Sequence, residues 1–290
     1  MFCSLFGFTK QAHYKCRTTS AHRSVQQRQA RDAVLRIRRQ MPRLGTRKLH
    51  FMLQEPFKAA GLKLGRDRLF DLLRREGLLV YKRRKYTVTT DSKHWMHKYP
   101  NRIKDLMVQR PEQLWVADIT YLDTLDGAGY LHLVTDAYSK RIMGYELSDN
   151  LEAASTLKAL TMAIDKRRYP HQPLIHHSDR GLQYCSRRYV DCLIENNIQI
   201  SMTENGDPYE NAVAERLNGI LKDEFGLDQR MDDLAQAHRQ THQSIDLYNH
   251  LRPHLSCHYL TPEQMHRQQS LKIKTWKKKT PEIRLTPEVM

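Results

Sequence analysis

The sequence predicts an α/β protein in which a mixed five-stranded sheet with flanking helices is preceded by an all-α domain. Apolar residues at helical spacing dominate residues 26–76. From residue 113 the pattern changes to short apolar runs separated by turns, which is typical of strands. Three acids, Asp118, Asp179 and Glu215, stand in or beside these elements, where a buried carboxylate needs a partner or a metal ion.

The net charge of +16 is unevenly distributed along the chain. Residues 1–110 carry 27 Lys and Arg against 7 Asp and Glu, whereas residues 111–230 carry 12 against 19. The basic front indicates a module that binds a polyanion, and the acidic middle is what a metal-dependent site requires. The alternative for the basic front is a merely solvated surface.

The cysteines and the hydropathy of the chain indicate the cellular compartment in which the protein is expected. The five cysteines are odd in number and form no Cys-x-x-Cys pair, which favours a reducing cytoplasm over a disulfide framework or a zinc finger. No apolar run approaches the ~18–20 residues of a membrane span. The first ten residues lack the order of a signal peptide. We therefore expect a soluble, cytoplasmic protein without a membrane partner.

The first 25 residues predict a partial helix-turn-helix segment. Residues 2–15 have the pattern of a helix end, a turn at Gly7 and a second helix capped by Thr9. Because the chain opens inside such a motif, we expect another reading frame or another subunit to supply the preceding piece.

Residues 26–90 predict a helix-turn-helix DNA-binding domain. A helix over 26–41 stops at Pro42, a second begins at the cap Thr46, and a third covers 66–76 after a glycine turn. The third helix directs leucines inward and the candidate DNA-binding residues outward: Arg66, Arg68, Arg74 and Arg75. A basic last helix suits insertion into the major groove, and the alternative is a small helical bundle with solvated arginines.

A basic stretch leads from this domain to the core. We expect its run Lys82, Arg83, Arg84 and Lys85 to contact DNA phosphates. Residues 91–112 lack a strong period and form the predicted basic linker.

Residues 113–228 predict the catalytic core. Three strands joined by short turns form an antiparallel meander, and helices and strands then alternate. The expected strands are 114–122, 130–136, 141–147, 174–177 and 198–202, and the expected helices are 151–168, 187–197 and 210–225. This order is that of a ribonuclease-H-like sheet. In that arrangement the first and fourth strands are neighbours, so Asp118 and Asp179 should lie close together.

Residues 229–270 predict a helical C-terminal extension. One helix covers 232–250, and Thr261 and Pro262 open a short last helix. Residues 271–290 predict a flexible basic tail.

The three acids predict a metal site. Carboxylates without a Cys/His cluster favour hard cations, Mg²⁺ or Mn²⁺. Two such ions, about 3.5–4 Å apart, activate the attacking oxygen and stabilise the leaving oxygen of a phosphodiester. Asp118, in the central strand, is the candidate to bridge both ions, with Asp179 and Glu215 each completing one.

The helix that carries Glu215 places further residues on the same face. Lys222 follows seven positions later, which is about 20° round the helix, and is suited to hold a DNA phosphate. Asn218 and Gly219 share this face, and Gly219 would let a backbone approach. A solvated lysine is the alternative for Lys222. For His176 and His177, orienting a metal-bound carboxylate and a purely structural role remain equally open.

Several sequence words resemble one transposase family. Asp118, Asp179 and Glu215, with 35 residues between the last two, match the acid signature of transposases and retroviral integrases. The chain resembles the second-frame (OrfB) transposase of the insertion-sequence-three family from about residue 5 to residue 268. The matching words are WVADITY at 115–121, HSDRGLQY at 177–184, NAVAE at 211–215 and YNHLRPH at 248–254.

This resemblance implies an activity and partners. Such enzymes bind transposon ends, hydrolyse a phosphodiester to free a 3′-hydroxyl, and use that hydroxyl for strand transfer into double-stranded target DNA. Members often act with, or fused to, the upstream-frame (OrfA) product, and a homo-oligomer on DNA is expected. The location implied is a prokaryotic cytoplasm, in association with the nucleoid.

Two other functions stay open on the sequence. One is an inactive DNA-binding regulator of the same ancestry, which the presence of all three acids and Lys222 argues against. The other is a metal-dependent nuclease of the ribonuclease H type that acts on hybrids. The basic front and the spacing from Asp179 to Glu215 favour a transposase over both.

Overall fold

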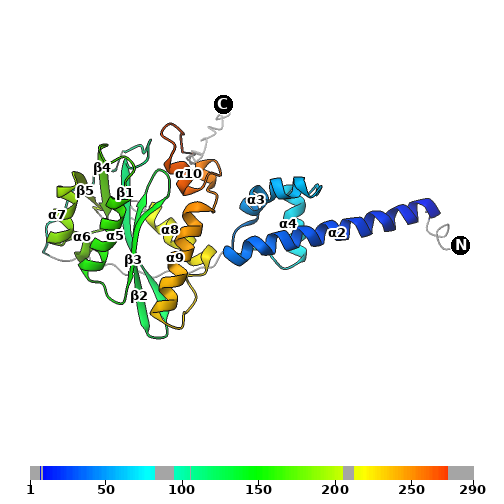
Figure 1. The fold of residues 1–290 in the computed structure, drawn as a ribbon, viewed down its shortest axis with the longest axis horizontal. Helices are drawn as coiled ribbons and strands as arrows, with labels where there is room; N and C mark the ends of the chain where they lie inside the picture. The colour runs from blue at the N-terminus through cyan, green and yellow to red at the C-terminus, as the bar shows by residue number, and fades with distance from the viewer. Residues whose placement is uncertain (1–6, 8, 82–94, 105, 205–211, 274–290) are drawn as a thin grey trace, which may run out of the picture.

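The computed structural model describes residues 7, 9–81, 95–104, 106–204 and 212–273. An elongated helical part lies beside a layered α/β part (Figure 1). The expected DNA contacts in the basic stretch lie outside the described residues: Lys82, Arg83, Arg84 and Lys85.

The helical part consists of α2 (Lys10–Gln40), α3 (Thr46–Ala59) and α4 (Arg66–Arg75). Leucines at helical spacing on α3 and α4, among them Leu49 and Leu69, are buried in one cluster. The helix expected over 26–41 is the second half of the longer α2, so the division at residue 25 falls inside a helix. The cap of α3 is Gly45, and Thr46 is its first helical residue.

The sheet contains β1 (Leu114–Thr124), β2 (Gly127–Asp136), β3 (Ile142–Ser148), β4 (Leu174–Ser178) and β5 (Ile198–Met202). Their order is β3-β2-β1-β4-β5. The first three strands are antiparallel, and β4 and β5 run parallel to β1. Together with its flanking helices, this mixed five-stranded sheet is ribonuclease-H-like, as the sequence predicts.

Side-chain alternation along β1 gives the sheet two buried faces. Trp115 and Ala117 pack in a cluster with α5 (Ala153–Asp165) and α7 (Arg187–Glu195). Leu114 and Val116 pack with Ala214 on the opposite face. That face is covered by α8 (Ala212–Phe225) and α9 (Leu234–His250), as Figure 1 shows. Between β4 and α7 lies the one-turn helix α6 (Leu182–Cys185), which was not predicted from the sequence.

One glycine is required where a helix meets the sheet. A Cβ added at Gly144 on β3 would lie 2.0 Å from the backbone oxygen of Ala159 and 2.7 Å from the backbone nitrogen of Ala163. Because these atoms belong to the backbone of α5, that helix approaches β3 as closely as it does only because residue 144 has no side chain.

The segment before β1 and the C-terminal extension also pack on the sheet. Beyond α9 the chain forms the 3₁₀ helix η2 (Leu255–Cys257) and then α10 (Pro262–His266). His266 Nε2 lies 3.1 Å from Glu112 Oε1, and His266 Nδ1 lies 3.8 Å from Asp136 Oδ1. All three side chains are buried, so α10 is fastened to the beginning of β1 and the end of β2. Among the described residues, no helix is long and apolar enough to cross a membrane.

Candidate active site

Strand pairing brings Asp118 and Asp179 together. Parallel pairing of β1 with β4 places Val116 opposite His177. Continuing that register by two residues sets Asp118 opposite Asp179, which directly follows β4. The expectation that these two acids are neighbours is therefore met by the observed strand order.

Asp118 points to the sheet face that α8 covers. Its Oδ2 accepts a hydrogen bond from Asn218 Nδ2 of α8, at 2.7 Å. Burial raises the pKa of Asp118 to about 7, and the negative charges of Asp179 and Glu215 add to the rise, although hydrogen bonds from the Ile119 backbone and Asn218 oppose it. An ordinary aspartate would be fully ionised at that pH, so Asp118 lies where both the loss of solvent and the nearby carboxylates disfavour its charged form.

The turn after β4 holds Asp179 in place. The backbone N–H of Gly181 donates to Asp179 Oδ1 at 3.0 Å. A Cβ at Gly181 would lie 3.1 Å from the same oxygen and 3.6 Å from the ring of Tyr184. Residue 181 therefore favours glycine because Asp179 and Tyr184 occupy the space around it.

Glu215 and Lys222 come from α8, which crosses the same face. Glu215 is exposed in the first turn, and Lys222 is half-buried in the last. Asn218, three positions after Glu215, marks the side of α8 that faces Asp118. Within the described part of the chain, no three His, Cys, Asp or Glu side chains lie close enough together to hold an ion. The three acids thus share one region without forming a closed ligand shell.

The donors in this region fit a hard divalent cation. They are carboxylate oxygens, together with the buried Oδ1 of Asn218, which has no hydrogen-bond partner among the described residues. Such oxygens suit Mg²⁺ or Mn²⁺. A cation here would also offset the charge repulsion that raises the pKa of Asp118.

His176 and His177 are buried and have partners on neighbouring elements. His176 Nε2 lies 2.9 Å from the hydroxyl of Tyr189, and His177 Nδ1 lies 2.9 Å from Ser201 Oγ. Burial, with the charge of His177, lowers the pKa of His176 to about 3, so that ring is neutral at pH 7. These contacts support the structural alternative for both histidines.

The arginines expected to bind DNA lie on the exposed side of α4. Arg66 Nε is 2.8 Å from Asp67 Oδ1, and Arg74 Nη1 is 2.7 Å from Asp71 Oδ1. Arg68 and Arg75 are exposed as well. All four arginines are therefore on the surface, and two of them are paired with aspartates of their own helix.

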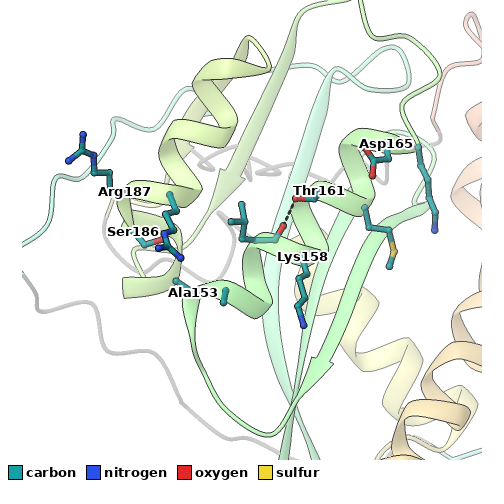
Figure 2. Close-up of a pocket in the computed structure, with 11 residues that line it drawn as sticks. Ala153, Lys158, Thr161, Asp165, Ser186 and Arg187 are labelled. Carbon is teal, nitrogen blue, oxygen red and sulfur yellow. Dashed lines mark hydrogen bonds between the residues drawn. The ribbon is translucent and has the colours of Figure 1, made fainter.

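A groove lies on the other side of the sheet, between α5 and the beginning of α7 (Figure 2). Its lining includes the apolar residues Leu157 and Met162 and the basic residues Lys158, Lys166 and Arg187. None of the three acids lines it. Because α5 covers the face opposite to Asp118, the groove is separate from the site.

Asn218 lies on the helix face predicted from the sequence, but its contact with Asp118 was not predicted. The available signal was its spacing of three from Glu215. Gly181 was likewise quoted only as part of a sequence word. Gly181 is only two residues after Asp179, so the hydrogen bond between them could have been predicted from the turn pattern Asp-Arg-Gly.

Known proteins resemble this chain along most of its length. Two family models, both described as "Integrase core domain", match residues 108–208 and 196–262. The "Insertion element IS600 uncharacterized 31 kDa protein" of Shigella sonnei is 31% identical over 264 residues, covering 90% of this chain and 95% of that protein. "Transposase InsF for insertion sequence IS3A" of Escherichia coli is 33% identical over 215 residues, covering 73% of this chain and 74% of its own.

Solved structures also resemble the core. The catalytic core domain of HTLV-2 integrase, in complex with magnesium, is 19% identical, with a TM-score of 0.42. The match covers 54% of this chain and 97% of that one.

Proposed function

The chain belongs to the insertion-sequence-three family of transposases, in the retroviral-integrase-like superfamily, and on that premise we propose that Asp118, Asp179 and Glu215 are its catalytic acids. The observation that carries this assignment is the convergence of β1, the end of β4 and α8 on one region, where burial, together with the charges of Asp179 and Glu215, raises the pKa of Asp118 to about 7. A polynucleotidyl transferase needs such a concentration of carboxylates where a phosphodiester reacts.

The proposed reaction has two displacements at phosphorus. In the first, the oxygen of water attacks a phosphorus atom at the transposon end, the bond to the 3′ oxygen breaks, and that oxygen leaves as a 3′-hydroxyl. In the second, the oxygen of this hydroxyl attacks a phosphorus atom of the target strand and forms a new P–O bond, while the bond from that phosphorus to the target's 3′ oxygen breaks and the 3′ oxygen leaves as a hydroxyl. No bond to the protein forms in either step.

The chain's own residues would position the reacting groups. Asn218 holds one oxygen of Asp118, and the backbone of Gly181 holds one oxygen of Asp179, so both carboxylates keep a fixed orientation. Asp118, Asp179 and Glu215 would hold Mg²⁺ or Mn²⁺, two ions in our proposal, which would supply activation of the attacking oxygen and stabilisation of the leaving oxygen. Lys222, on the same helix as Glu215, would hold a phosphate of the DNA.

The partners follow from the same premise. The exposed arginines of α4 would contact the terminal inverted repeats, and the basic stretch that contains Lys82 would follow the phosphates. We expect the upstream-frame product, as partner or fusion, and a homo-oligomer on the DNA. The site of action would be the nucleoid in a prokaryotic cytoplasm.

Single substitutions of the acids test this function. Purified full-length protein, alone and with the upstream-frame product, is incubated with duplexes that carry the element's inverted repeats and Mg²⁺ or Mn²⁺. We expect Asp118→Asn, Asp179→Asn and Glu215→Gln each to reduce nicking and strand joining at least about a thousandfold while end binding persists. The matched control is Glu195→Gln, an exposed acid on α7.

Wild-type rates in any of the three acid variants would refute the assignment. End binding by the wild type without any metal-dependent cleavage, with the upstream-frame product present, would instead support the DNA-binding regulator.

A further inference from the structure

A half-buried carboxylate, that of Glu224, contacts three parts of the chain at the end of α8. Glu224 Oε1 accepts from Lys48 Nζ of α3 at 2.7 Å. Arg252, which follows α9, donates to both oxygens of Glu224, from Nε at 2.8 Å and from Nη2 at 2.9 Å. The Arg252 side chain is only 2% exposed, and those of Glu224 and Lys48 are 16% and 17% exposed. Glu224 is therefore surrounded by cations from the helical part and from the C-terminal extension.

The helical part has further contacts at the same place. The backbone N–H of Arg43 donates to the carbonyl of Glu224 at 3.1 Å. Its guanidinium donates to the carbonyl of Asp223 at 3.4 Å and lies 3.8 Å from the Asp223 carboxylate. The last turn of a helix carries unpaired carbonyls and a partial negative charge, so cations at this end stabilise it.

The charges in this cluster are strongly coupled. Burial alone would raise the pKa of Glu224, but the hydrogen bonds and charges of Arg252 and Lys48 outweigh it and lower that pKa. Burial, followed by the charge of Arg252, lowers the pKa of Lys48 to about 8. His254, whose Nε2 lies 2.6 Å from Arg252 Nη1, is kept neutral because burial and Arg252 hold its pKa well below 6.5. Loss of Glu224 would leave Lys48 and Arg252 without a counter-charge, whereas loss of Lys48 would leave Glu224 paired with Arg252 alone.

The helix held at Glu224, α8, also carries Glu215 of the candidate active site. Glu224 lies nine residues after Glu215, roughly 13–14 Å along α8 at 1.5 Å per residue. Between them, Asn218 binds Asp118. Since a helix transmits a displacement along its axis, the position of Glu215 over the sheet depends on how the end of α8 is held.

We propose that Lys48 is a positioning residue for the transposase reaction, which it serves by holding Glu224 and hence the helix that carries Glu215. Arg43 acts in the same way on the last turn of α8. The domain that binds the transposon end therefore also sets the catalytic helix. This inference rests on the proposed role of Glu215.

The test compares Lys48→Met, which removes the charge and keeps an unbranched side chain of similar length, with Lys48→Arg, which keeps the charge. Lys58→Met, at an exposed position of the same α3, is the matched control. Three quantities are measured for each: the affinity for an end duplex, the cleavage rate at saturating duplex, and amide hydrogen exchange over residues 212–225 without metal or DNA. Lys48→Met should keep the affinity within about twofold, lose about tenfold in rate and speed exchange in α8. Lys48→Arg should restore rate and protection.

Unchanged exchange in α8 for Lys48→Met would overturn the proposal, as would a loss of end affinity that accounts for the whole loss of rate. A wild-type protein without cleavage would refute the proposed function instead, and hydrogen exchange would still decide whether Lys48 holds α8.

Discussion

At the scale of single residues, Asp118 combines burial with two like-charged neighbours. Its folded-state pKa of about 7 lies above the ordinary 3.8, so ionising it costs the folded state more than the unfolded state. The stability contributed by the protonated form is complete below pH 4 and is lost as the pH rises to about 7. Asp118→Asn, which cannot ionise, should therefore raise the Tm of the metal-free protein at pH 8, and the gain should shrink towards pH 4.

Thermal unfolding in the presence of a chelator measures this effect, with Glu195→Gln as the control that leaves the Tm unchanged. A lower Tm for Asp118→Asn at pH 8 would contradict the electrostatic account. Added Mg²⁺ should raise the Tm of the wild type, but not that of Asp118→Asn.

The proximity of Asp118 to Asp179 could be predicted from the sequence, and the contact between Asn218 and Asp118 could not. Strand order alone places Asp118 beside Asp179, because the first and fourth strands of this fold are neighbours. A hydrogen bond between residues a hundred positions apart depends on how far α8 slides across the sheet, and side-chain spacing within one helix does not contain that information.

At the scale of elements, the packing of α5 on β3 depends on Gly144. Gly144→Ala places a methyl group within 2.0 Å of backbone, so α5 must move away, and we expect a loss of at least about 1–3 kcal/mol in the free energy of unfolding. Gly219→Ala on α8 is the matched control, because open space surrounds its added Cβ. Alanine in a helix interior should there stabilise by up to about 1 kcal/mol. Urea denaturation measures both, and equal effects would contradict the packing argument.

The cluster that fastens α10 should depend on pH. Burial opposes ionisation of all three groups, but hydrogen bonds between them raise the pKa of His266 and lower the pKa values of Glu112 and Asp136. The stability that His266 contributes to the folded protein is complete below pH 6.5 and is lost as the pH rises through its folded-state pKa. The stability that Glu112 and Asp136 contribute is complete above about pH 4.5 and is lost as the pH falls through their folded-state pKa values.

His266→Gln should accordingly lower the Tm most between pH 4.5 and 6.5, with a smaller effect at pH 9. His250→Gln, at an exposed residue paired with Asp246, is the control and should change the Tm little. A loss that is constant from pH 5 to 9 would assign His266 a packing role only.

Element boundaries were predicted well where periodicity was strong and poorly where the helix was polar. The antiparallel meander and the parallel strands appear as expected. The first half of α2 was expected as separate pieces, since its polar residues give no apolar stripe, although neither Pro nor Gly interrupts residues 10–40. The cap of α3 was misassigned by one residue because Gly45 and Thr46 are both acceptable at a helix start.

At the scale of the whole molecule, the charge is divided between a basic front and an acidic core. Binding to an end duplex should therefore weaken steeply with salt, by a slope of about −0.9 in log affinity against log salt for each neutralised phosphate. The double variant Arg68→Gln with Arg75→Gln should reduce the magnitude of that slope by about 1.8. Arg187→Gln, at an exposed residue of the core, should leave it unchanged. A slope that is the same in all three proteins would exclude α4 from the interface.

The sequence predicted a DNA-binding part and a catalytic part but not how they are joined. Lys48 and Glu224 are 176 positions apart, and Glu224 and Arg252 are 28 apart, so nothing local connects them. Opposite charges are also too common in a chain with 48 basic and 32 acidic residues for a pairing to be predicted from composition.

The contacts of Lys48 and Arg43 with Glu224 should limit how freely the helical part can be exchanged between related transposases. Consider a hybrid that takes its helical part from one relative and its sheet from another. It would bind the terminal repeats of the relative that supplied the helical part, but it would not cleave them on that account alone. To cut them it would also need residues equivalent to Lys48 and Arg43 that fit the recipient's α8. We therefore expect that specificity for DNA ends can be transferred between relatives only when the residues that contact α8 are transferred with the helical part.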